Sequence, residues 1–210
     1  MFITFEGIEG SGKSTQILLL ANTLKAKGIS VVLTREPGGT PIGDQVRKVL
    51  LDPANVALDP TAELLLYAAS RSQHLREVIL PALAAGSIVL CDRFSDATLA
   101  YQGYGRGLDI EVIRSLDRIV TKGMRPDLTV LFDISAGAGV ARAHGRNKVQ
   151  GLEAEARFEN EEIAFHERVR QGYLALLKQE PDRICMVDAA PALEVVQTKV
   201  REIVDRKLAG

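Results

Sequence analysis

The chain has 210 residues, of which 46% are hydrophobic and 25% are charged, as is usual for a globular protein able to bury a sizeable core. Its 26 basic and 27 acidic side chains give a net charge of −1, which disfavours a nucleic-acid partner because such binders usually carry a basic excess. No apolar run approaches the roughly 20 residues of a membrane span, and no secretory signal opens the chain. We therefore expect a cytoplasmic protein without a membrane partner.

Apolar runs of strand length alternate with runs of helical periodicity. The strand runs are nearly continuous, which is typical of strands buried on both faces of a parallel sheet. The order predicts one α/β domain over residues 1–210, a doubly wound three-layer fold with five parallel strands and helices on both faces. Strands are expected at 2–6, 30–34, 87–91, 128–134 and 184–188. Helices are expected at 13–27, 41–51, 61–85, 109–122, 136–144, 159–179 and 191–208, with Pro81 kinking or breaking the third.

The segment after the first strand run has the pattern Gly-x-x-x-x-Gly-Lys-Ser of a phosphate-binding loop. Glycines allow successive amides to point inward at an anion, and the following helix presents its positive end to the same phosphates. We expect Lys13, in a solvent-facing loop, to reach the outer phosphates, and Ser14 to coordinate Mg²⁺. The candidate ATP phosphate-binding residues are Gly7, Ile8, Glu9, Gly10, Ser11, Gly12, Lys13, Ser14 and Thr15.

A second element fits the same chemistry. The apolar run SIVLC is followed by Asp92 and Arg93. A carboxylate just beyond a buried strand resembles the position that holds Mg²⁺ directly or through water in other phosphate-loop proteins. The alternative is an ordinary aspartate at the end of a strand.

Cys91 and Cys185 lie in apolar runs and are expected to be buried free thiols. The three scattered histidines give no metal-ligand cluster.

The loop alone leaves GTPases, motor ATPases and small-molecule kinases open. A GTPase should carry Asn-Lys-x-Asp, but residues 147–150 read Asn-Lys-Val-Gln and follow no strand run. Motors usually need a longer chain. A kinase is the remaining class of this length. Three alternatives stay open at this point: a nucleoside-monophosphate kinase, another small-molecule kinase of the same fold, and a non-catalytic nucleotide-binding switch.

Four further segments together resemble bacterial thymidylate kinases. They are TREPGGT (34–40), LLLYAASRSQ (64–73), CDRFSDATLAYQGYGRG (91–107) and RPDLTVLFDI (125–134). The resemblance runs from the first strand to about residue 175 and is far more specific than the phosphate loop. It implies a phosphate-loop kinase fold, transfer of the γ-phosphoryl group of ATP to dTMP with Mg²⁺, and a homodimer.

Tyr67 and Arg71 are four residues apart and share one helical face. A ring can stack on a base and a guanidinium can donate to base carbonyls, although a core tyrosine beside an exposed arginine gives the same pattern. The resemblance assigns both to the thymine base, with tyrosine where family members often have phenylalanine. It places Glu9 at the sugar 3′-hydroxyl or a magnesium-bound water. The remaining dTMP-binding candidates are Arg35, Pro37, Arg93, Thr98, Tyr101 and Gln102.

The loop between its glycines has no basic residue before Lys13, so a stabilising arginine must come from elsewhere. Residues 145–158 form the least apolar stretch, and a lid is expected over about 142–158, the alternative being a solvated linker. Arg142 and Arg146 are four apart and can point the same way, and glycines at 145 and 151 could act as hinges. The resulting catalytic candidates are Lys13, Arg93, Glu9, Arg142, Arg146 and Arg157.

Overall fold

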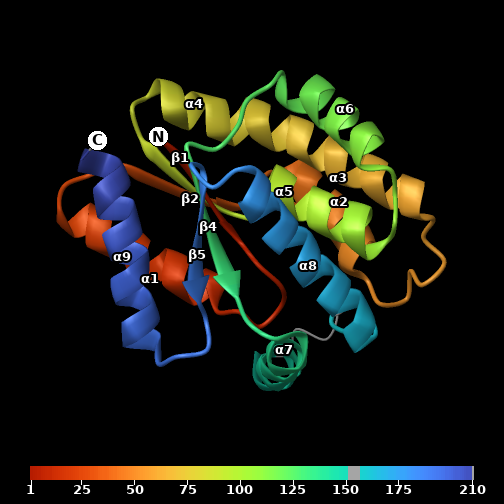
Figure 1. The fold of residues 1–210 in the computed structure, drawn as a ribbon. Coiled ribbons are helices and arrows are strands. Elements are labelled where there is room, and N and C mark those ends of the chain that lie inside the picture. Colours follow the sequence, from red (N-terminus) through yellow and green to blue (C-terminus); the bar gives the residue numbers. More distant parts are fainter. Residues whose placement is uncertain (151–156, 210) are drawn as a thin grey trace.

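The computed structural model describes residues 1–150 and 157–209, without the side chains of 146–150. A five-stranded parallel sheet has the order β2-β3-β1-β4-β5, so the first strand lies at its centre (Figure 1). The strands are β1 (Phe2–Glu6), β2 (Val31–Arg35), β3 (Ile88–Asp92), β4 (Leu128–Asp133) and β5 (Ile184–Asp188). Each lies within one residue of its predicted range. The α/β fold with a five-stranded parallel sheet is thereby confirmed.

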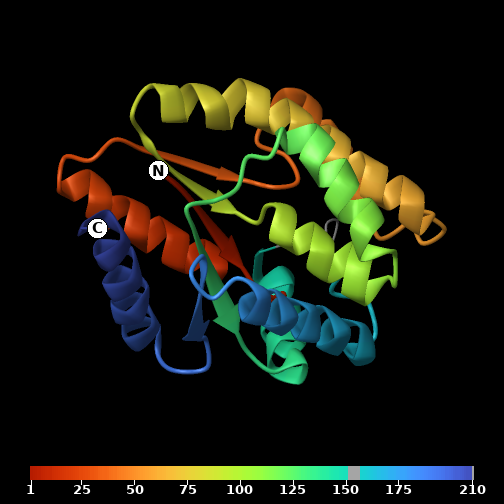
Figure 2. The same cartoon turned by 45° about the horizontal axis from the view of Figure 1, so that its top comes forward.

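Helices cover both faces of the sheet. The helix α1 packs with α9 on one side, whereas α3 to α6 and α8 lie on the other (Figures 1 and 2). The helices are α1 (Lys13–Ala26), α2 (Pro41–Leu51), α3 (Pro60–His74), α4 (Leu80–Ala84), α5 (Ser95–Thr98), α6 (Ile110–Thr121), α7 (Ala136–Gln150), α8 (Ile163–Gln179) and α9 (Leu193–Ala209), with π-helical segments η1 (Leu75–Ile79) and η2 (Leu99–Gly105). Among the helices described, none is both long and apolar enough to span a bilayer.

The long third helix changes its winding rather than breaking at proline. Its three parts α3, η1 and α4 follow one another without a gap, and Pro81 lies in the first turn of α4. Proline lacks the N–H for an α-helical bond, and its ring crowds the carbonyl four residues earlier. The wider π-helical turn just before it accommodates both effects. The disturbance therefore falls upstream of Pro81, over η1.

The sequence pattern predicts neither a helix nor a strand for residues 95–105, but they form α5 and η2. Most of this segment is buried, and η2 packs along α8. Its sequence has no amphipathic stripe because it is enclosed on most sides. The segment brings Thr98, Tyr101 and Gln102 to the carboxyl edge of the sheet.

The sheet provides the core. Phe2, Ile3 and Phe5 of β1 are at most 1% exposed, and Leu90 and Val130 of the flanking strands are fully buried. Parallel pairing sets Phe5 beside Asp92 and Glu6 beside Leu131. β1 lies between β3 and β4 at the centre of the sheet, where the connections between strands diverge toward its two edges. Ligands of open α/β sheets bind at the carboxyl ends of the strands at this position.

Cys91 is buried and Cys185 is half-buried; both are free thiols.

Candidate nucleotide site

A cleft of about 660 Å³ lies at the carboxyl ends of β1 and β3. It brings together most residues predicted from separate parts of the sequence. The predicted residues that line it are Glu9, Gly10, Ser11, Gly12, Lys13, Ser14, Thr15, Arg35, Pro37, Tyr67, Arg71, Asp92, Arg93, Thr98, Tyr101, Gln102 and Arg142. The loop residues Gly7 and Ile8 are not among the residues that line the cleft. Ile8 is buried beneath the loop.

The loop between β1 and α1 has the backbone that a phosphate cradle requires. Gly7, Gly10 and Gly12 have φ values of 136°, 67° and 85°, which favour glycine. Gly12 is the N-cap of α1 and has no side-chain cap. The first N–H groups of the helix and its positive dipole end are therefore available to an anion.

Lys13 differs from the expectation of a solvent-facing side chain. It is 6% exposed, and its ammonium donates to the carbonyls of Gly7 (2.9 Å) and Ile8 (2.8 Å) and to Oγ of Ser11 (3.1 Å). Burial, together with the nearby charge of Arg93, lowers the pKa of Lys13 to about 8. The loop folds over the lysine because three acceptors satisfy its three donors. A polyphosphate would have to draw the ammonium away from these acceptors.

Ser14 and Asp92 form the candidate magnesium site. The hydroxyl of Ser14 donates to Oδ2 of Asp92 at 2.7 Å, because the pairing of β3 with β1 sets Asp92 beside the start of the loop. Two adjacent oxygen groups at the cleft suit a hard cation that keeps several waters. The residues present therefore fit Mg²⁺. Among the residues described, no group of three His, Cys, Asp or Glu side chains could hold a metal alone.

Glu9 lies beneath the cleft within a set of donors. Its Oε1 accepts from Nη2 of Arg93 (2.9 Å) and from the hydroxyl of Tyr101 (2.6 Å). Burial raises the pKa of the Glu9 carboxyl, but the charges of Arg93 and Lys13 and the Tyr101 bond outweigh it and lower the pKa to about 2. The apparent mismatch of an acid inside a phosphate loop is thus resolved by neighbouring cations. A solvent-facing Glu9 is excluded, since only 10% of its side chain is exposed.

Arg93 joins the loop to the acceptor side. Its Nη1 donates to the carbonyl of Gly7 (2.9 Å) and to the hydroxyl of Tyr173 (3.1 Å). Its φ is +70°, a conformation that costs of order 1–3 kcal/mol for a non-glycine residue. Such strain often accompanies function, and here it aims the guanidinium across the carboxyl ends of β1 and β3.

His166 was missed by the sequence reading. It is fully buried on α8, and its Nδ1 lies 3.2 Å from Oε2 of Glu9. Neither atom has an aligned hydrogen-bond partner among the residues described. Isolated histidines outside a motif give no signal in a single sequence. Only the packing of α8 against η2 brings His166 to the loop.

Arg71 lies in a buried network rather than at the surface. It is 3% exposed, and its Nε donates to Oε2 of Glu36 at 2.8 Å. The other carboxylate oxygen of Glu36 contacts Nδ1 of His74 (2.9 Å), and Nε2 of His74 contacts Oγ1 of Thr34 (2.6 Å). The sequence reading assigned no role to Glu36 or His74. Tyr67, one turn before Arg71 on α3, also lines the cleft and is half-buried.

The end of β2 and the loop that follows it form the more exposed side of the cleft. Arg35 is 54% exposed and lies 3.9 Å from Asp44. The carbonyl of Pro37 accepts from Nη1 of Arg47 at 3.1 Å. Arg47 lines the cleft too, although it belongs to none of the sequence motifs that predict site residues. This side therefore carries two arginines at the mouth of the cleft.

The predicted lid arginines are separated. Arg142 lines the cleft and donates to the carbonyls of Ala189 (2.8 Å) and Ala190 (3.2 Å). Arg157 is not among the lining residues: it is buried against Oε2 of Glu63 at 2.7 Å and donates to the carbonyl of Leu50. The side chain of Arg146 lies outside the described residues. In place of Arg157, its neighbours Phe158 and Glu159 reach the cleft.

Comparisons with known proteins agree with this geometry. The thymidylate kinase family model matches residues 5–200. The chain belongs to the thymidylate kinase family. It is 57% identical over 209 residues to a thymidylate kinase of Trichlorobacter lovleyi, covering 100% of this chain and 99% of the relative. The match to that of Geotalea daltonii is 53% over 210 residues, covering 100% and 98%. The crystal structure of thymidylate kinase from Ehrlichia chaffeensis aligns with a TM-score of 0.77 at 37% identity, covering 98% of each chain. Membership in the thymidylate kinase family, predicted from the quoted segments, is thereby confirmed.

Proposed function

We propose that this chain transfers the γ-phosphoryl group of ATP to dTMP, giving dTDP and ADP. The observation that carries the proposal is that one cleft brings the phosphate loop together with Tyr67 and the buried Arg71 of α3 and with Gln102 of η2. The loop suits the donor and the opposite wall suits a nucleoside monophosphate. Membership in the thymidylate kinase family supports the same reaction.

The reaction needs no protein nucleophile, because an oxygen of the dTMP phosphate attacks the γ-phosphorus of ATP directly. The protein positions both phosphates and neutralises the charge that builds on the moving group. Lys13 and the amides of 10–15 bind the donor phosphates. Arg93, held between the loop and Tyr173, holds the acceptor phosphate.

Ser14 and Asp92 would hold Mg²⁺. When bound, the ion neutralises charge on the phosphate oxygens. The 2.7 Å contact between their oxygens keeps both groups on one side of the phosphate loop.

Tyr67 stacks on the base and Arg71 donates to a base carbonyl, with Thr98 and Gln102 completing the wall. Gln102 is held by Oε1 of Glu63 at 2.8 Å, which fixes its amide. Glu9, fixed through Oε1 by Arg93 and Tyr101, accepts from the sugar 3′-hydroxyl. Arg35 and Pro37 border the acceptor.

The test is a panel of nucleoside monophosphates with ATP, with ADP formation measured by a coupled assay. ADP should form fastest with dTMP. dUMP should follow, since one methyl group in an apolar pocket is worth roughly 1–3 kcal/mol, and dCMP should be the poorest of the three because its amino group meets the donors of Arg71. Preference for another monophosphate would make the chain a different kinase of this fold. ATP binding with no ADP formation from any acceptor would favour a nucleotide-binding switch.

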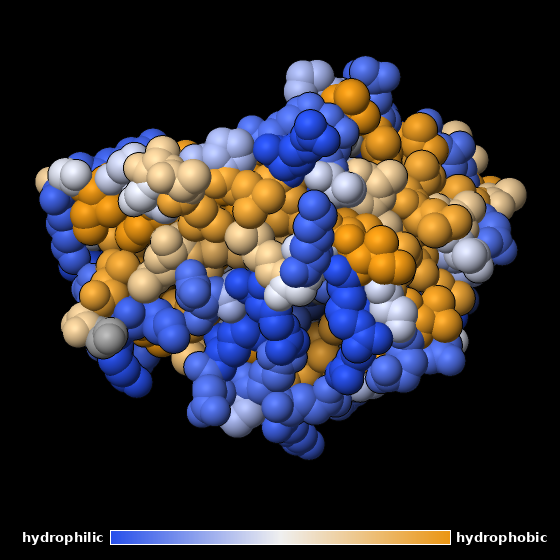
Figure 3. Space-filling view, turned by 90° about the horizontal axis from the view of Figure 1, so that it is seen from above, coloured by the Kyte–Doolittle hydropathy of each residue, from blue (hydrophilic) through white to orange (hydrophobic). Residues whose placement is uncertain are grey.

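We further propose a homodimer in the cytoplasm. Leu65 of α3 and Val112 and Ile119 of α6 are 54%, 57% and 75% exposed, and α3 packs on α6. Figure 3 looks onto these helices and shows apolar side chains gathered across this face. Exposed apolar patches of this kind mark association surfaces. Light scattering after chromatography should give the dimer mass, and Ile119→Arg should shift it to the monomer.

A further inference from the structure

Arg71 is held by the protein at almost every donor. A guanidinium has five N–H groups. Within the part of the chain that the structure describes, four are directed at protein acceptors: Nε at Oε2 of Glu36 (2.8 Å), Nη1 at Oδ1 of Asp117 (3.3 Å), and Nη2 at the carbonyl of Phe94 (3.1 Å) and Oγ1 of Thr98 (2.7 Å). One N–H, on Nη1, is left for a ligand in the cleft. The direction of that N–H depends on the acceptor that binds the other N–H of Nη1.

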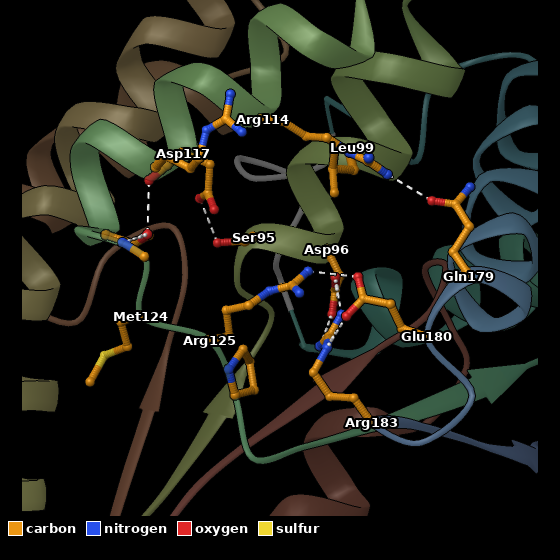
Figure 4. Close-up of a pocket in the computed structure, with 14 residues that line it drawn as sticks. Ser95, Asp96, Leu99, Arg114, Asp117, Met124, Arg125, Gln179, Glu180 and Arg183 are labelled. Carbon is orange, nitrogen blue, oxygen red and sulfur yellow. Dashed lines mark hydrogen bonds and ion pairs between the residues drawn. The ribbon is translucent and has the colours of Figure 1, made fainter.

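Asp117 is the residue that accepts from the other N–H of Nη1. It lies on α6, which no sequence motif marked, and its Oδ1 also accepts from Oγ of Ser95 at 2.6 Å (Figure 4). The contact with Ser95 fixes the carboxylate, because that serine begins α5 just behind the cleft. Only a quarter of the Asp117 side chain is exposed, so the bond to Arg71 is poorly screened.

Asp117 also lines a second cavity. This accessory pocket has a volume of about 510 Å³ and lies among α5, α6 and the segments leading to β4 and β5. Its wall includes Arg114, Glu180 and Arg183 (Figure 4). Arg71 lines the nucleotide cleft and Asp117 lines the accessory pocket. Their bond is therefore a direct link between the two cavities.

We propose that Asp117 is a positioning residue for base recognition: it holds Nη1 of Arg71 so that the remaining N–H meets the base of the acceptor nucleotide. Glu36 cannot replace it, because Glu36 contacts the opposite edge of the guanidinium at Nε. Without Asp117, the Nη1 end loses its one described protein acceptor. The guanidinium keeps its bonds at Nε and Nη2, but its Nη1 end can shift, so the remaining N–H is aimed less well at the base. The inference rests on the proposed role of Arg71 in reading the base.

The test compares kcat/KM for dTMP and dCMP in Asp117→Ala. The ratio in favour of dTMP should fall about 10-fold, since a loosened Arg71 gains less from a carbonyl and is repelled less by an amino group. The KM for dTMP should rise while the KM for ATP stays within about twofold of wild type. Asp117→Asn keeps an oxygen at Oδ1 and should restore most of the ratio. A purely structural role would lower the melting temperature and leave the ratio unchanged.

Glu180→Gln is the matched control, because Glu180 lines the same pocket and contacts Arg125 and Arg183 but not Arg71; its ratio should equal that of wild type. Arg71→Ala distinguishes the proposed role of Arg71 in base recognition from the role of Asp117 in positioning it. If Arg71→Ala keeps the base preference, the proposed role of Arg71 is wrong. If Arg71→Ala loses it and folded Asp117→Ala keeps it, only the role of Asp117 is overturned. Should Asp117→Ala not fold, Asp117→Ser, too short to reach Arg71, supplies the same comparison.

Discussion

Gly10 of the phosphate loop and Gly139 of α7 meet backbone to backbone. A Cβ on Gly139 would stand 2.6 Å from the carbonyl oxygen of Glu9 and 2.8 Å from Cδ1 of Ile8, and a Cβ on Gly10 would overlap the carbonyl of Gly139. The first turn of the helix that leads into the predicted lid therefore rests directly on the loop. No side chain fits between them, so the position of α7 and the shape of the loop depend on each other.

We expect Gly139→Ala to weaken nucleotide binding. The loop backbone would have to move by several tenths of an ångström, which should raise the KM for ATP by about 10-fold and lower the melting temperature. Gly137→Ala, on the same helix with open space at the Cβ position, is the control. It should be neutral or stabilising by up to about 1 kcal/mol, because alanine is the better helix former. Equal effects of the two variants would contradict the packing argument.

Lys13→Met tests the phosphate loop. Methionine keeps the buried stem of the side chain and removes the charge, so kcat should fall by about 10²–10³-fold, the range for loss of one charge-stabilising donor. Because the carbonyls of Gly7 and Ile8 lose the ammonium, stability should also fall by about 1–3 kcal/mol. Circular dichroism should show a folded protein. Near-normal turnover in that folded variant would remove Lys13 from the mechanism.

The sheet could be predicted from the sequence because each strand is enclosed by helices. Enclosed strands need apolar side chains on both faces, and that gives short continuous runs such as FITFE and IVLCD. The phosphate loop could be predicted because its function lies in consecutive residues. The cleft residues of 91–107 could be assigned only through the resemblance to a family. Nothing in their own pattern revealed the buried helical segment that carries them.

The remaining partners could not be predicted because they are contacts between distant segments. His74 with Glu36, His166 with Glu9 and Arg157 with Glu63 join residues 38, 157 and 94 positions apart. A single sequence has no signal for such pairs. Arg157 shows the consequence: its charge suggested a mobile catalytic group, whereas the structure encloses it between Glu63 and Phe158.

The stability of the fold should depend on pH through Glu6. Burial, with the nearby charge of Asp96, raises the pKa of Glu6 from 4.5 to about 8. The folded state therefore keeps a proton that the unfolded state has lost. From pH 4.5 to about 8, this carboxyl should lower the free energy of unfolding by up to about 1.4 kcal/mol per pH unit.

Glu6→Gln removes the titration. Its side-chain oxygen still accepts from the N–H of Phe94, and its amide nitrogen takes the place of the oxygen that now accepts from the hydroxyl of Tyr173. Urea unfolding of both proteins between pH 5 and 9 gives the comparison. The loss of stability with rising pH should be smaller in the variant. Parallel curves would show that Glu6 does not change its protonation on unfolding in this range.

Arg142 and Arg157 should have opposite phenotypes, although the sequence suggested the same role for both. Arg142 lines the cleft on α7, and its present acceptors are two backbone carbonyls that a phosphate can replace. Arg157 faces the fully buried carboxylate of Glu63. Breaking a buried ion pair costs up to about 3–5 kcal/mol. Arg106 and Gln102 also contact the carboxylate of Glu63, so the loss should lie at or below the lower end of this range.

Arg142→Ala should therefore lower kcat by about 10²-fold or more, near the range for arginines that stabilise a transferring phosphoryl group, with little change in dTMP binding or melting temperature. Arg157→Ala should lower the melting temperature by several degrees and leave kcat per folded molecule within a few-fold of wild type. Steady-state kinetics beside thermal unfolding separates the two. If Arg157→Ala loses turnover while keeping its stability, Arg157 leaves Glu63 during catalysis and acts at the phosphates. If Arg142→Ala keeps its turnover, the stabilising charge comes from Arg93 and Lys13, which both donate to the carbonyl of Gly7 in the phosphate loop.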